Sequence, residues 1–244
     1  MASVLSVVIP CFDEEPTLRA CVESVLALRG PDLGLEIVIV DDGSRDRSLE
    51  IAREIASRHR DVRVLRHDKN RGKGAALRTG FRDVTGDLVA VQDADLEYDP
   101  RELAALIQPI RDGRADVVIG SRFQGTGPCR VRYSWHFLGN NLLTLVSNMC
   151  TGLNLTDIES CYKVFRRDII QSIDIEEDRF GVEPEIVAKL ARRNLRIHEM
   201  AISYRGRTHA EGKKVTWKDG ARALYCIARY NAPHLRHRLS HSRL

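Results

Sequence analysis

The chain has 244 residues, which suffice for one sizeable hydrophobic core but are few for two full domains. Hydrophobic residues make up 43% of it and charged residues 30%, a composition typical of globular proteins that excludes a mainly disordered or fibrous chain. No segment approaches about 18 consecutive apolar residues, and the N-terminus lacks the basic start and long apolar core of a secretory signal. The six cysteines form no C-x-x-C pair, which favours reduced thiols and argues against a zinc site. We therefore expect a cytoplasmic protein that neither spans a membrane nor is exported.

The net charge of +4 is unevenly distributed along the chain. Residues 203–244 contain ten Lys and Arg residues against two acidic residues, a net charge of +8, whereas residues 1–202 carry −4. This basic end favours an anionic partner such as a nucleotide diphosphate, a phosphorylated substrate or an anionic membrane surface, and beyond Pro233 a solvated tail is the alternative. We predict one domain over residues 1–220, followed by a basic C-terminal helix or tail over residues 221–244.

The first 120 residues alternate short apolar runs with amphipathic segments. The runs are rich in β-branched residues, as in strands buried on both faces of a parallel sheet, and they cover residues 4–10, 35–40, 62–65, 87–92 and 115–120. Apolar side chains at helical spacing lie between them, over residues 18–28, 49–56, 77–84 and 103–110. The alternation predicts an α/β fold in which helices flank both faces of a mostly parallel sheet. Further on we predict a helix near 135–150, a strand at 162–165, a helix at 184–193 and a last strand at 196–204.

Charged clusters follow four of the predicted strands. They comprise residues 13–14, 41–42, 93–97 and 121–122. Ligands of open α/β sheets bind beyond the carboxyl ends of the strands, so we expect these clusters to converge on one rim. Most of the clustered side chains are carboxylates, and a bound cation with an anionic ligand would relieve their repulsion.

The tripeptide Asp93-Ala94-Asp95 is the sharpest local signal. Two carboxylates separated by one small residue at a strand end supply the oxygen ligands that Mg²⁺ or Mn²⁺ prefers, and water and a diphosphate fill the remaining positions. We predict Asp93 and Asp95 as metal ligands. Glu97 is a candidate third ligand, and its alternative is a carboxylate in the first turn of a helix that begins near Pro100.

Gly72, Lys73 and Gly74 stand at a predicted helix start. The surrounding sequence lacks the glycines that a Walker loop or a dinucleotide-binding loop requires. An ATPase and a dinucleotide-binding protein are therefore disfavoured. The helix N-terminus with Lys73 could still face an anionic or ribose-bearing ligand. A plain helix start with loop glycines is the alternative.

Seven motifs follow one another in order: V-V-I-P-C-F-D-E-E, I-V-D-D-G-S-R-D, N-R-G-K-G-A-A-L, Q-D-A-D-L-E, G-S-R-F, D-I-E-S-C-Y-K-V-F and G-R-T-H-A-E-G-K-K. Together they resemble glycosyltransferase family 2, specifically the branch of dolichyl-phosphate mannose and polyprenyl-phosphate glucose synthases. The resemblance covers residues 4–220. It implies a GT-A fold, a nucleotide-diphosphate-sugar donor such as GDP-mannose or a UDP-hexose, a divalent metal, and transfer with inversion at the anomeric carbon.

The resemblance also implies roles for individual residues. By this resemblance, the base and ribose of the donor bind at Pro10, Phe12, Glu14 and Asp41, with Asp42 beside them. The metal and diphosphate bind at Asp93 and Asp95, with Ala94 between them. The cationic groups on the donor and acceptor phosphates are Arg122, Arg207 and Lys213. Two departures stand out. Cys161 replaces the glycine usual at its position, and these 244 residues do not contain the C-terminal transmembrane pair that some members carry.

The acceptor decides whether the reaction needs a base. A polyprenyl or dolichyl phosphate is already ionised, because the second pKa of a phosphate monoester lies near about 6. A hydroxyl acceptor needs a carboxylate that takes its proton, and the candidates are Asp157, Glu183 and Glu185, each with capping as its structural alternative. We favour the lipid phosphate and predict Asp157, Asp95 and Arg122 as the catalytic residues. A sugar-nucleotide nucleotidyltransferase is disfavoured, because its G-x-G-x-R loop is absent after the first strand.

The predicted partners follow from this reading. We expect a nucleotide-diphosphate sugar and a lipid phosphate at the cytoplasmic membrane face, and no nucleic acid. The apolar segment 135–146 either rests on lipid or packs on the core, and the basic residues of 234–243 are suited to anionic headgroups. A membrane-protein partner and a homo-oligomer both remain open.

Overall fold

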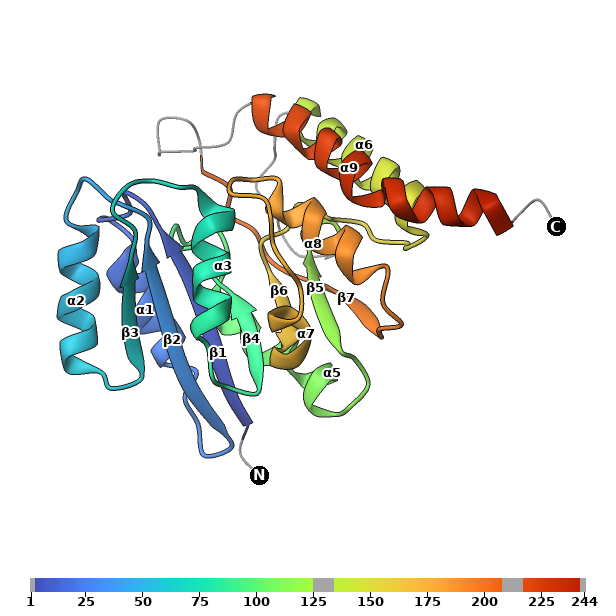
Figure 1. Ribbon diagram of the computed structural model, residues 1–244. Coiled ribbons are helices and arrows are strands. Elements are labelled where there is room, and N and C mark those ends of the chain that lie inside the picture. Colours follow the sequence, from blue (N-terminus) through green and yellow to red (C-terminus); the bar gives the residue numbers. More distant parts are fainter. Residues whose placement is uncertain (1–2, 125–133, 208–216, 242–244) are drawn as a thin grey trace.

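The computed structural model describes residues 3–124, 134–207 and 217–241, with the side chains of 134–137, 217 and 233–241 excluded (Figure 1). Within these ranges a seven-stranded sheet has the order β3-β2-β1-β4-β6-β5-β7. The strands are β1 (Ser3–Cys11), β2 (Leu33–Asp41), β3 (Val62–Arg66), β4 (Leu88–Val91), β5 (Val117–Ser121), β6 (Lys163–Arg166) and β7 (Ile197–Ala201). All pair in parallel except β6, which runs antiparallel between β4 and β5.

The register of β1 and β2 brings their carboxyl ends together, since Cys11 is the partner of Asp41. The antiparallel direction of β6 has a second effect. Its first residue, Lys163, pairs with Ile119 near the end of β5, so the loop that precedes β6 enters the sheet at the edge where β4 and β5 end. The loops after four strands and the loop before a fifth therefore share one rim.

Helices cover both faces of the sheet, as predicted; in Figure 1, α3 lies in front of the sheet and α1 behind it. The helices are α1 (Leu18–Leu26), α2 (Ser48–Arg58), α3 (Lys73–Asp83), α4 (Leu103–Leu106), α5 (Gln108–Arg111), α6 (Ser134–Thr151), α7 (Arg167–Gln171), α8 (Val182–Leu190) and α9 (Trp217–His241), with a short 3₁₀ turn, η1 (Pro100–Glu102). Apolar side chains fill the space between these layers, and strand residues such as Val7, Ile9, Ile37 and Ile39 are fully buried. Burial of such side chains is the main stabilising contribution to this fold.

Two predicted elements differ from the structure in extent. The helix predicted over 103–110 is divided into α4 and α5, because Pro109 has no N–H to continue the hydrogen-bond ladder. The last strand ends at Ala201 instead of 204. Beyond it the N–H of Ser203 donates to Glu102, so the chain leaves the sheet toward the site rim.

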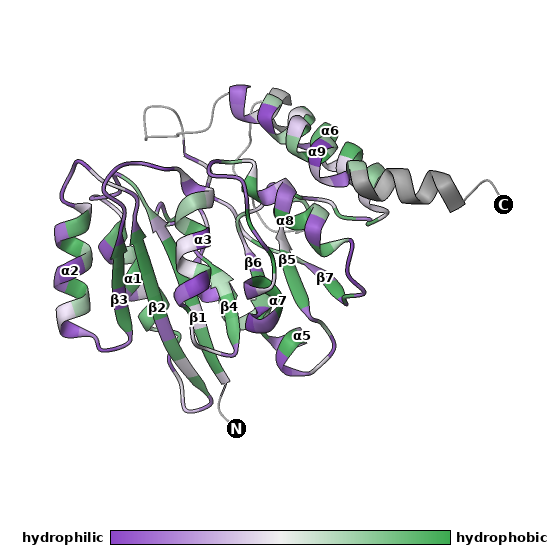
Figure 2. Cartoon of the chain, in the orientation of Figure 1, coloured by the Kyte–Doolittle hydropathy of each residue, from purple (hydrophilic) through white to green (hydrophobic). Residues whose placement is uncertain are grey.

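Helices α6 and α9 lie side by side above the strand ends, next to α8 (Figure 1). Figure 2 shows that the described part of α9 alternates hydrophobic and hydrophilic residues, and its Cys226, Ile227 and Tyr230 are buried. The predicted boundary at residue 220 falls inside α9, and the division there stays a prediction. Among the helices of the described residues, none combines the length and apolarity needed to cross a membrane.

Candidate active site

The loop after β4 carries the two acidic residues of the predicted metal site. Lys73 Nζ donates to Asp93 Oδ2 at 2.9 Å, and the N–H of Glu97 donates to Asp95 Oδ1 at 3.1 Å. Ala94 between them is 2% exposed, so a small side chain suits this position. Burial, together with the negative charges of Asp93 and Glu97, raises the pKa of Asp95 to about 7. Negative charge is thus concentrated on this loop, and Lys73 offsets part of it through its contact with Asp93.

Backbone conformation marks the same rim. Among the described residues, the non-glycine residues with positive φ are Asp13, at 50°, and Leu96, at 57°. Both follow strands whose ends form the site. Such conformations cost free energy and gather at functional sites, so their place here supports the rim as the binding region.

Lys73 begins α3 and joins two acidic residues. Its Nζ lies 2.9 Å from Asp93 Oδ2 and 2.9 Å from Glu183 Oε1. Burial opposes its charge, but the two carboxylates outweigh burial and hold the pKa of Lys73 well above its usual value. A Cβ at Gly74 would come within 2.1 Å of the carbonyl oxygen of Glu177, so glycine permits the helix start to pack against this loop. Lys73 therefore fixes Asp93, and with it the loop of residues 93–97 that carries the predicted metal ligands, which we call the metal loop.

The carboxyl ends of β1 and β2 supply the residues expected to hold the base and ribose. Asp41 is fully buried, and its Oδ1 has no hydrogen-bond partner among the described residues. Asp42 is occupied differently, because it accepts from His67 Nδ1 at 2.6 Å and from the N–H of Gly72 at 2.7 Å. Asp42 thus fixes the loop before α3, while Asp41 keeps an acceptor available. Pro10, near the end of β1, and Phe12, directly after it, are half-buried at the same edge of the sheet.

Glu97 anchors the segment that follows β7. Its carboxylate accepts from Tyr204 Oη at 2.5 Å and from the N–H of Arg207 at 2.6 Å, and its carbonyl accepts from the N–H of Arg205 at 2.8 Å. Both carboxylate oxygens thus accept a hydrogen bond from the segment after β7, and coordination of a metal by Glu97 stays a prediction. Glu97 therefore joins the metal loop to residues 204–207, which follow β7.

Arg207 reaches the nucleotide end of the rim. Its Nη1 lies 2.9 Å from Glu14 Oε2, and its Nη2 donates to the carbonyl of Asp95 at 2.5 Å. The structure thus brings Arg207 together with Glu14 and the metal loop, which are far apart in sequence. Lys213, predicted to act with Arg207, lies outside the described residues.

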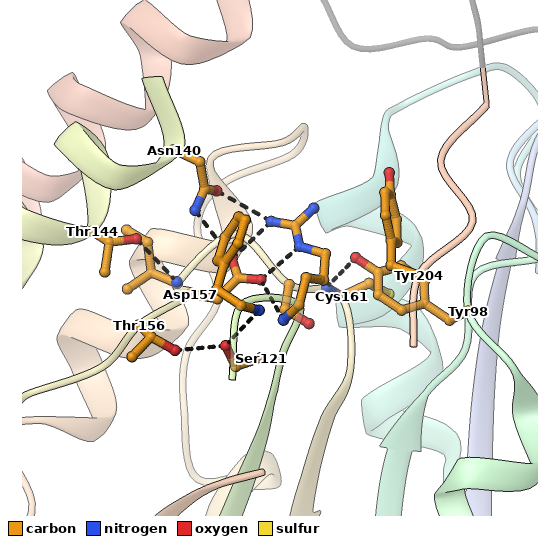
Figure 3. Close-up of polar contacts among 12 residues, drawn as sticks. Tyr98, Ser121, Asn140, Thr144, Thr156, Asp157, Cys161 and Tyr204 are labelled. Atoms are coloured by element: carbon orange, nitrogen blue, oxygen red, sulfur yellow. Dashed lines mark hydrogen bonds and ion pairs between the residues drawn. The ribbon is translucent and has the colours of Figure 1, made fainter. Parts of the chain in front are cut away.

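Arg122 and Asp157 form a buried ion pair at the other end of the rim (Figure 3). Arg122 Nε and Nη2 donate to the two oxygens of Asp157 at 2.6 and 2.7 Å, and Asp157 is fully buried. Asn140 of α6 accepts from Arg122 at 3.1 Å, and the ring of Tyr204 lies 5.2 Å from the guanidinium. Bidentate pairing fixes both side chains. Asp157 is therefore engaged as the partner of a cation, and its role as a base stays a prediction.

The other two candidate bases have structural contacts as well. Glu185 accepts from the N–H groups of Glu176 and Glu177, both at 2.8 Å, so it holds the segment before α8 in place. Glu183 binds Lys73 through one oxygen, and its Oε2 has no partner among the described residues. Cys161, which departs from the family pattern, is buried beside this group; burial and the charge of Asp93 raise the pKa of its thiol.

Sequence reasoning missed several residues that support the site. Tyr98 stacks on Tyr162 with ring centroids 4.8 Å apart, and its hydroxyl accepts from the N–H of Cys161 at 3.3 Å (Figure 3). Glu199 of β7 accepts from the N–H of Asp157 at 3.1 Å. Tyr98 follows directly after the acidic motif of residues 93–97, and this position is the one feature of the sequence that could have indicated its place at the site. Nothing in the sequence relates Glu199 to Asp157.

The donor set fits a shared metal site. Within the described residues, no three His, Cys, Asp or Glu side chains are grouped closely enough to hold a metal ion. Asp93 and Asp95 nevertheless present hard oxygen donors on one loop, and Mg²⁺ commonly binds through one or two carboxylates while water and substrate phosphates complete its shell. The residues present therefore match a cation that arrives with a diphosphate.

Comparison with known proteins decides the family. Residues 6–174 match the family model for glycosyl transferase family 2. The chain belongs to this family. It is 33% identical over 235 residues, 96% of its length, to the low-salt glycan biosynthesis hexosyltransferase Agl6 of Haloferax volcanii. It is 32% identical over 192 residues, 76% of its length, to the dolichol-phosphate mannosyltransferase of Pyrococcus furiosus.

The chain spans 55% of the Haloferax relative and 52% of the Pyrococcus relative, so it corresponds to about half of each of these family 2 proteins. Among solved structures, glucosyl-3-phosphoglycerate synthase from Mycobacterium tuberculosis in complex with UDP is similar, with a TM-score of 0.73 and 20% identity over 94% of this chain and 80% of that one. This similarity confirms the predicted GT-A fold.

Proposed function

We propose that the chain transfers a hexose from a nucleotide-diphosphate sugar to a polyprenyl phosphate, with a divalent metal and with inversion at the anomeric carbon. The observation that carries this proposal is the arrangement of the rim. The loop after β4, with Asp93 and Asp95, lies between the end of β2 and the end of β5. Asp41 at the end of β2 has an oxygen without a partner among the described residues, and Arg122 after β5 is a buried cation. That order matches a donor laid out as base, diphosphate and sugar. Family membership and the GT-A fold support it.

The nucleotide binds at the ends of β1 and β2. Asp41 Oδ1, which has no partner within the described ranges, is a buried acceptor for an N–H of the base or a hydroxyl of the ribose. Glu14 and Phe12 lie on the adjoining loop, and Arg207 contacts Glu14 at 2.9 Å. Binding of the donor would bring the diphosphate within reach of this guanidinium, whose fork suits phosphate oxygens.

The diphosphate binds at the loop after β4, where Asp93 and Asp95 would hold Mg²⁺ or Mn²⁺. The bound cation would neutralise the charge that develops on the leaving diphosphate. Lys73 fixes the direction of Asp93 through their 2.9 Å contact. Arg207, and Lys213 beyond the described residues, would add positive charge on the phosphates.

The state of Asp157 favours a phosphate as acceptor. Both of its oxygens are bonded to Arg122, so it is engaged as an ion-pair partner and is not poised to accept a proton from a hydroxyl. A lipid phosphate needs no base, because it is already ionised at neutral pH. Relatives whose names include dolichol phosphate and dodecaprenyl phosphate, from Pyrococcus furiosus and Rhizobium johnstonii, support this choice. The enzyme would then work at the cytoplasmic face of a membrane.

A panel of UDP- and GDP-sugars, each with Mg²⁺ or Mn²⁺, tests the proposal. We expect release of nucleoside diphosphate that depends on both the metal and a polyprenyl phosphate, and an inverted anomeric configuration in the product. We also expect Asp41→Asn to weaken nucleoside diphosphate binding by about tenfold, the value of one hydrogen bond to a charged group. Turnover on a hydroxyl acceptor that is lost in Asp157→Asn, with none on the lipid phosphate, would instead assign Asp157 as the base.

A further inference from the structure

One face of helix α6 carries polar side chains four residues apart, namely Asn140, Thr144 and Asn148. The loop between α6 and β6 is bonded to this face. Asn148 Nδ2 donates to the carbonyl of Leu155 at 2.7 Å, and Asn148 Oδ1 accepts from the N–H of Leu155 at 3.1 Å. Thr144 Oγ1 accepts from the N–H of Ile158 at 3.4 Å. The loop is therefore attached to α6 on both sides of Asp157.

Asn140 contacts both members of the Arg122–Asp157 ion pair (Figure 3). Its Oδ1 accepts from Arg122 Nη2 at 3.1 Å, and its Nδ2 donates to Asp157 Oδ1 at 3.4 Å. A guanidinium can only donate and an ionised carboxylate can only accept, so a single orientation of the amide satisfies both partners. Asn140 therefore joins the cation to the anion through both of its polar atoms.

The contacts of Arg122 leave one nitrogen of its guanidinium for a ligand. Nε and Nη2 are bonded to Asp157, and Nη2 also to Asn140, whereas Nη1 makes no hydrogen bond within the described ranges. The guanidinium carbon lies 5.2 Å from the ring centroid of Tyr204 and 5.7 Å from that of Phe123. The hydrogen bonds hold one edge of the guanidinium and the rings border it, so the direction of Nη1 is fixed.

We propose that Asn140 is a positioning residue for the acceptor phosphate, acting through Arg122, whose guanidinium it holds in the ion pair with Nη1 directed to that phosphate. The inference rests on the proposed function and deepens it, because it concerns the group that would receive the acceptor. An arginine that is oriented in advance loses little side-chain entropy when the phosphate binds. Without the amide, one hydrogen bond on each member of the pair is lost and the guanidinium is less constrained.

Steady-state kinetics with a polyprenyl phosphate in detergent micelles, together with calorimetry of nucleoside diphosphate and Mn²⁺, tests this role. In Asn140→Ala we expect the KM for the lipid phosphate to rise by about tenfold, the value of one hydrogen bond to a charged group. We expect kcat to change by less than about threefold. The affinity for the nucleoside diphosphate should stay within about twofold, because that ligand is proposed to bind at the opposite end of the rim.

Asn141→Ala is the matched control. Asn141 is the next residue of the same helix and is also half-buried, and its side chain has no hydrogen bond among the residues that the structure describes. The substitution removes the same group from the same element, so it should change neither the KM for the lipid phosphate nor the affinity for the nucleoside diphosphate.

Asn140→Asp separates positioning from a purely structural role. The new side chain has nearly the same shape and keeps an oxygen that can accept from Arg122, so it would be the milder variant if Asn140 only supported the fold. A second carboxylate at the guanidinium also gives the cluster a net negative charge, which repels a phosphate. We therefore expect the KM for the lipid phosphate to rise several-fold beyond that of Asn140→Ala.

Three results would overturn the inference and leave the proposed function standing: a KM in Asn140→Ala equal to that in Asn141→Ala, an equal loss of lipid phosphate and nucleotide binding in Asn140→Ala, or a lower KM in Asn140→Asp than in Asn140→Ala. An unmodified protein that turns over no polyprenyl phosphate would overturn the proposed function, and this inference with it.

Discussion

At the scale of single residues, neighbouring carboxylates in one motif have different tasks. In the part of the chain that the structure describes, Asp41 has one buried oxygen without a partner, whereas Asp42 accepts from His67 and from the backbone of the loop before α3. Asp95 lies within a loop of like charges, whereas Glu97 is bound by Tyr204 and Arg207. Every one of these side chains is a carboxylate, so the hydrogen-bond partners decide which of them remains available to a ligand.

Asp95 is the first residue to test. We expect Asp95→Ala to abolish metal-dependent donor binding and to leave the fold intact, because its carboxylate bonds only the backbone of the same loop among the contacts described here. Calorimetry with donor and Mn²⁺ measures the binding, and circular dichroism checks the fold. Unchanged donor binding in the variant would contradict the assignment of Asp95 as a metal ligand.

Glu159 gives a prediction for stability. Burial raises its pKa from 4.5 to about 8, so the carboxyl group stays protonated to a higher pH in the folded state than in the unfolded state. The free energy of unfolding should therefore fall as the pH rises from about 4.5 to about 8, by up to about 5 kcal/mol at about 1.4 kcal/mol per pKa unit. Glu159→Gln removes the titrating group, so its stability relative to the unmodified protein should rise between about pH 4.5 and about pH 8. Urea unfolding at several pH values measures this, and a constant difference would contradict the burial of the charge.

At the scale of elements, the loop after β4 and the segment after β7 act as one unit. Glu97 contributes two side-chain hydrogen bonds and one backbone hydrogen bond to residues 204–207, and Arg207 returns to the carbonyl of Asp95. The antiparallel β6 similarly brings the loop that contains Asp157 to the rim. Connections between loops, and not the length of any single helix or strand, therefore shape the site.

Glu97→Ala tests this connection. The loss of the bonds to Tyr204 and Arg207 should release the segment after β7, so trypsin should cleave after Arg205 and Arg207 several-fold faster than in the unmodified protein. We also expect a nucleoside diphosphate with metal to slow cleavage between Tyr204 and Val215. Glu23→Gln, on the exposed side of α1, provides the control. Cleavage rates that respond neither to the substitution nor to the ligand would refute the coupling.

At the scale of the whole molecule, the surface beside the rim is apolar, and the C-terminal sequence that adjoins it is basic. One side of α6 exposes large hydrophobic side chains at helical spacing, namely Leu138, Leu142, Leu145 and Met149. Helix α9 lies beside α6 within the segment that carries a net charge of +8. This combination is suited to the surface of an anionic bilayer, where a polyprenyl phosphate is found.

We therefore expect binding to anionic but not to neutral vesicles, and weaker binding at high salt because each basic residue contributes about 1 kcal/mol at most. Deletion of residues 234–244 should reduce it. The double substitution Leu142→Glu and Leu145→Glu should weaken it by about tenfold or more, as each loses the transfer of one apolar side chain. Vesicle cosedimentation measures all three, and equal binding to both vesicle types would contradict the model of an electrostatic attachment.

The sequence by itself determined the alternation of strands and helices and the motifs at the strand ends. β-Branched runs and helical apolar spacing are local properties, and Asp93-Ala94-Asp95 is contiguous, so both could be predicted from one chain. Only the tertiary structure decided the partners. The bonds of Arg207 to Glu14, of Lys73 to Glu183 and of Arg122 to Asp157 join residues from different loops. Burial and pairing depend on how the loops meet at the rim, and that information is absent from local sequence patterns.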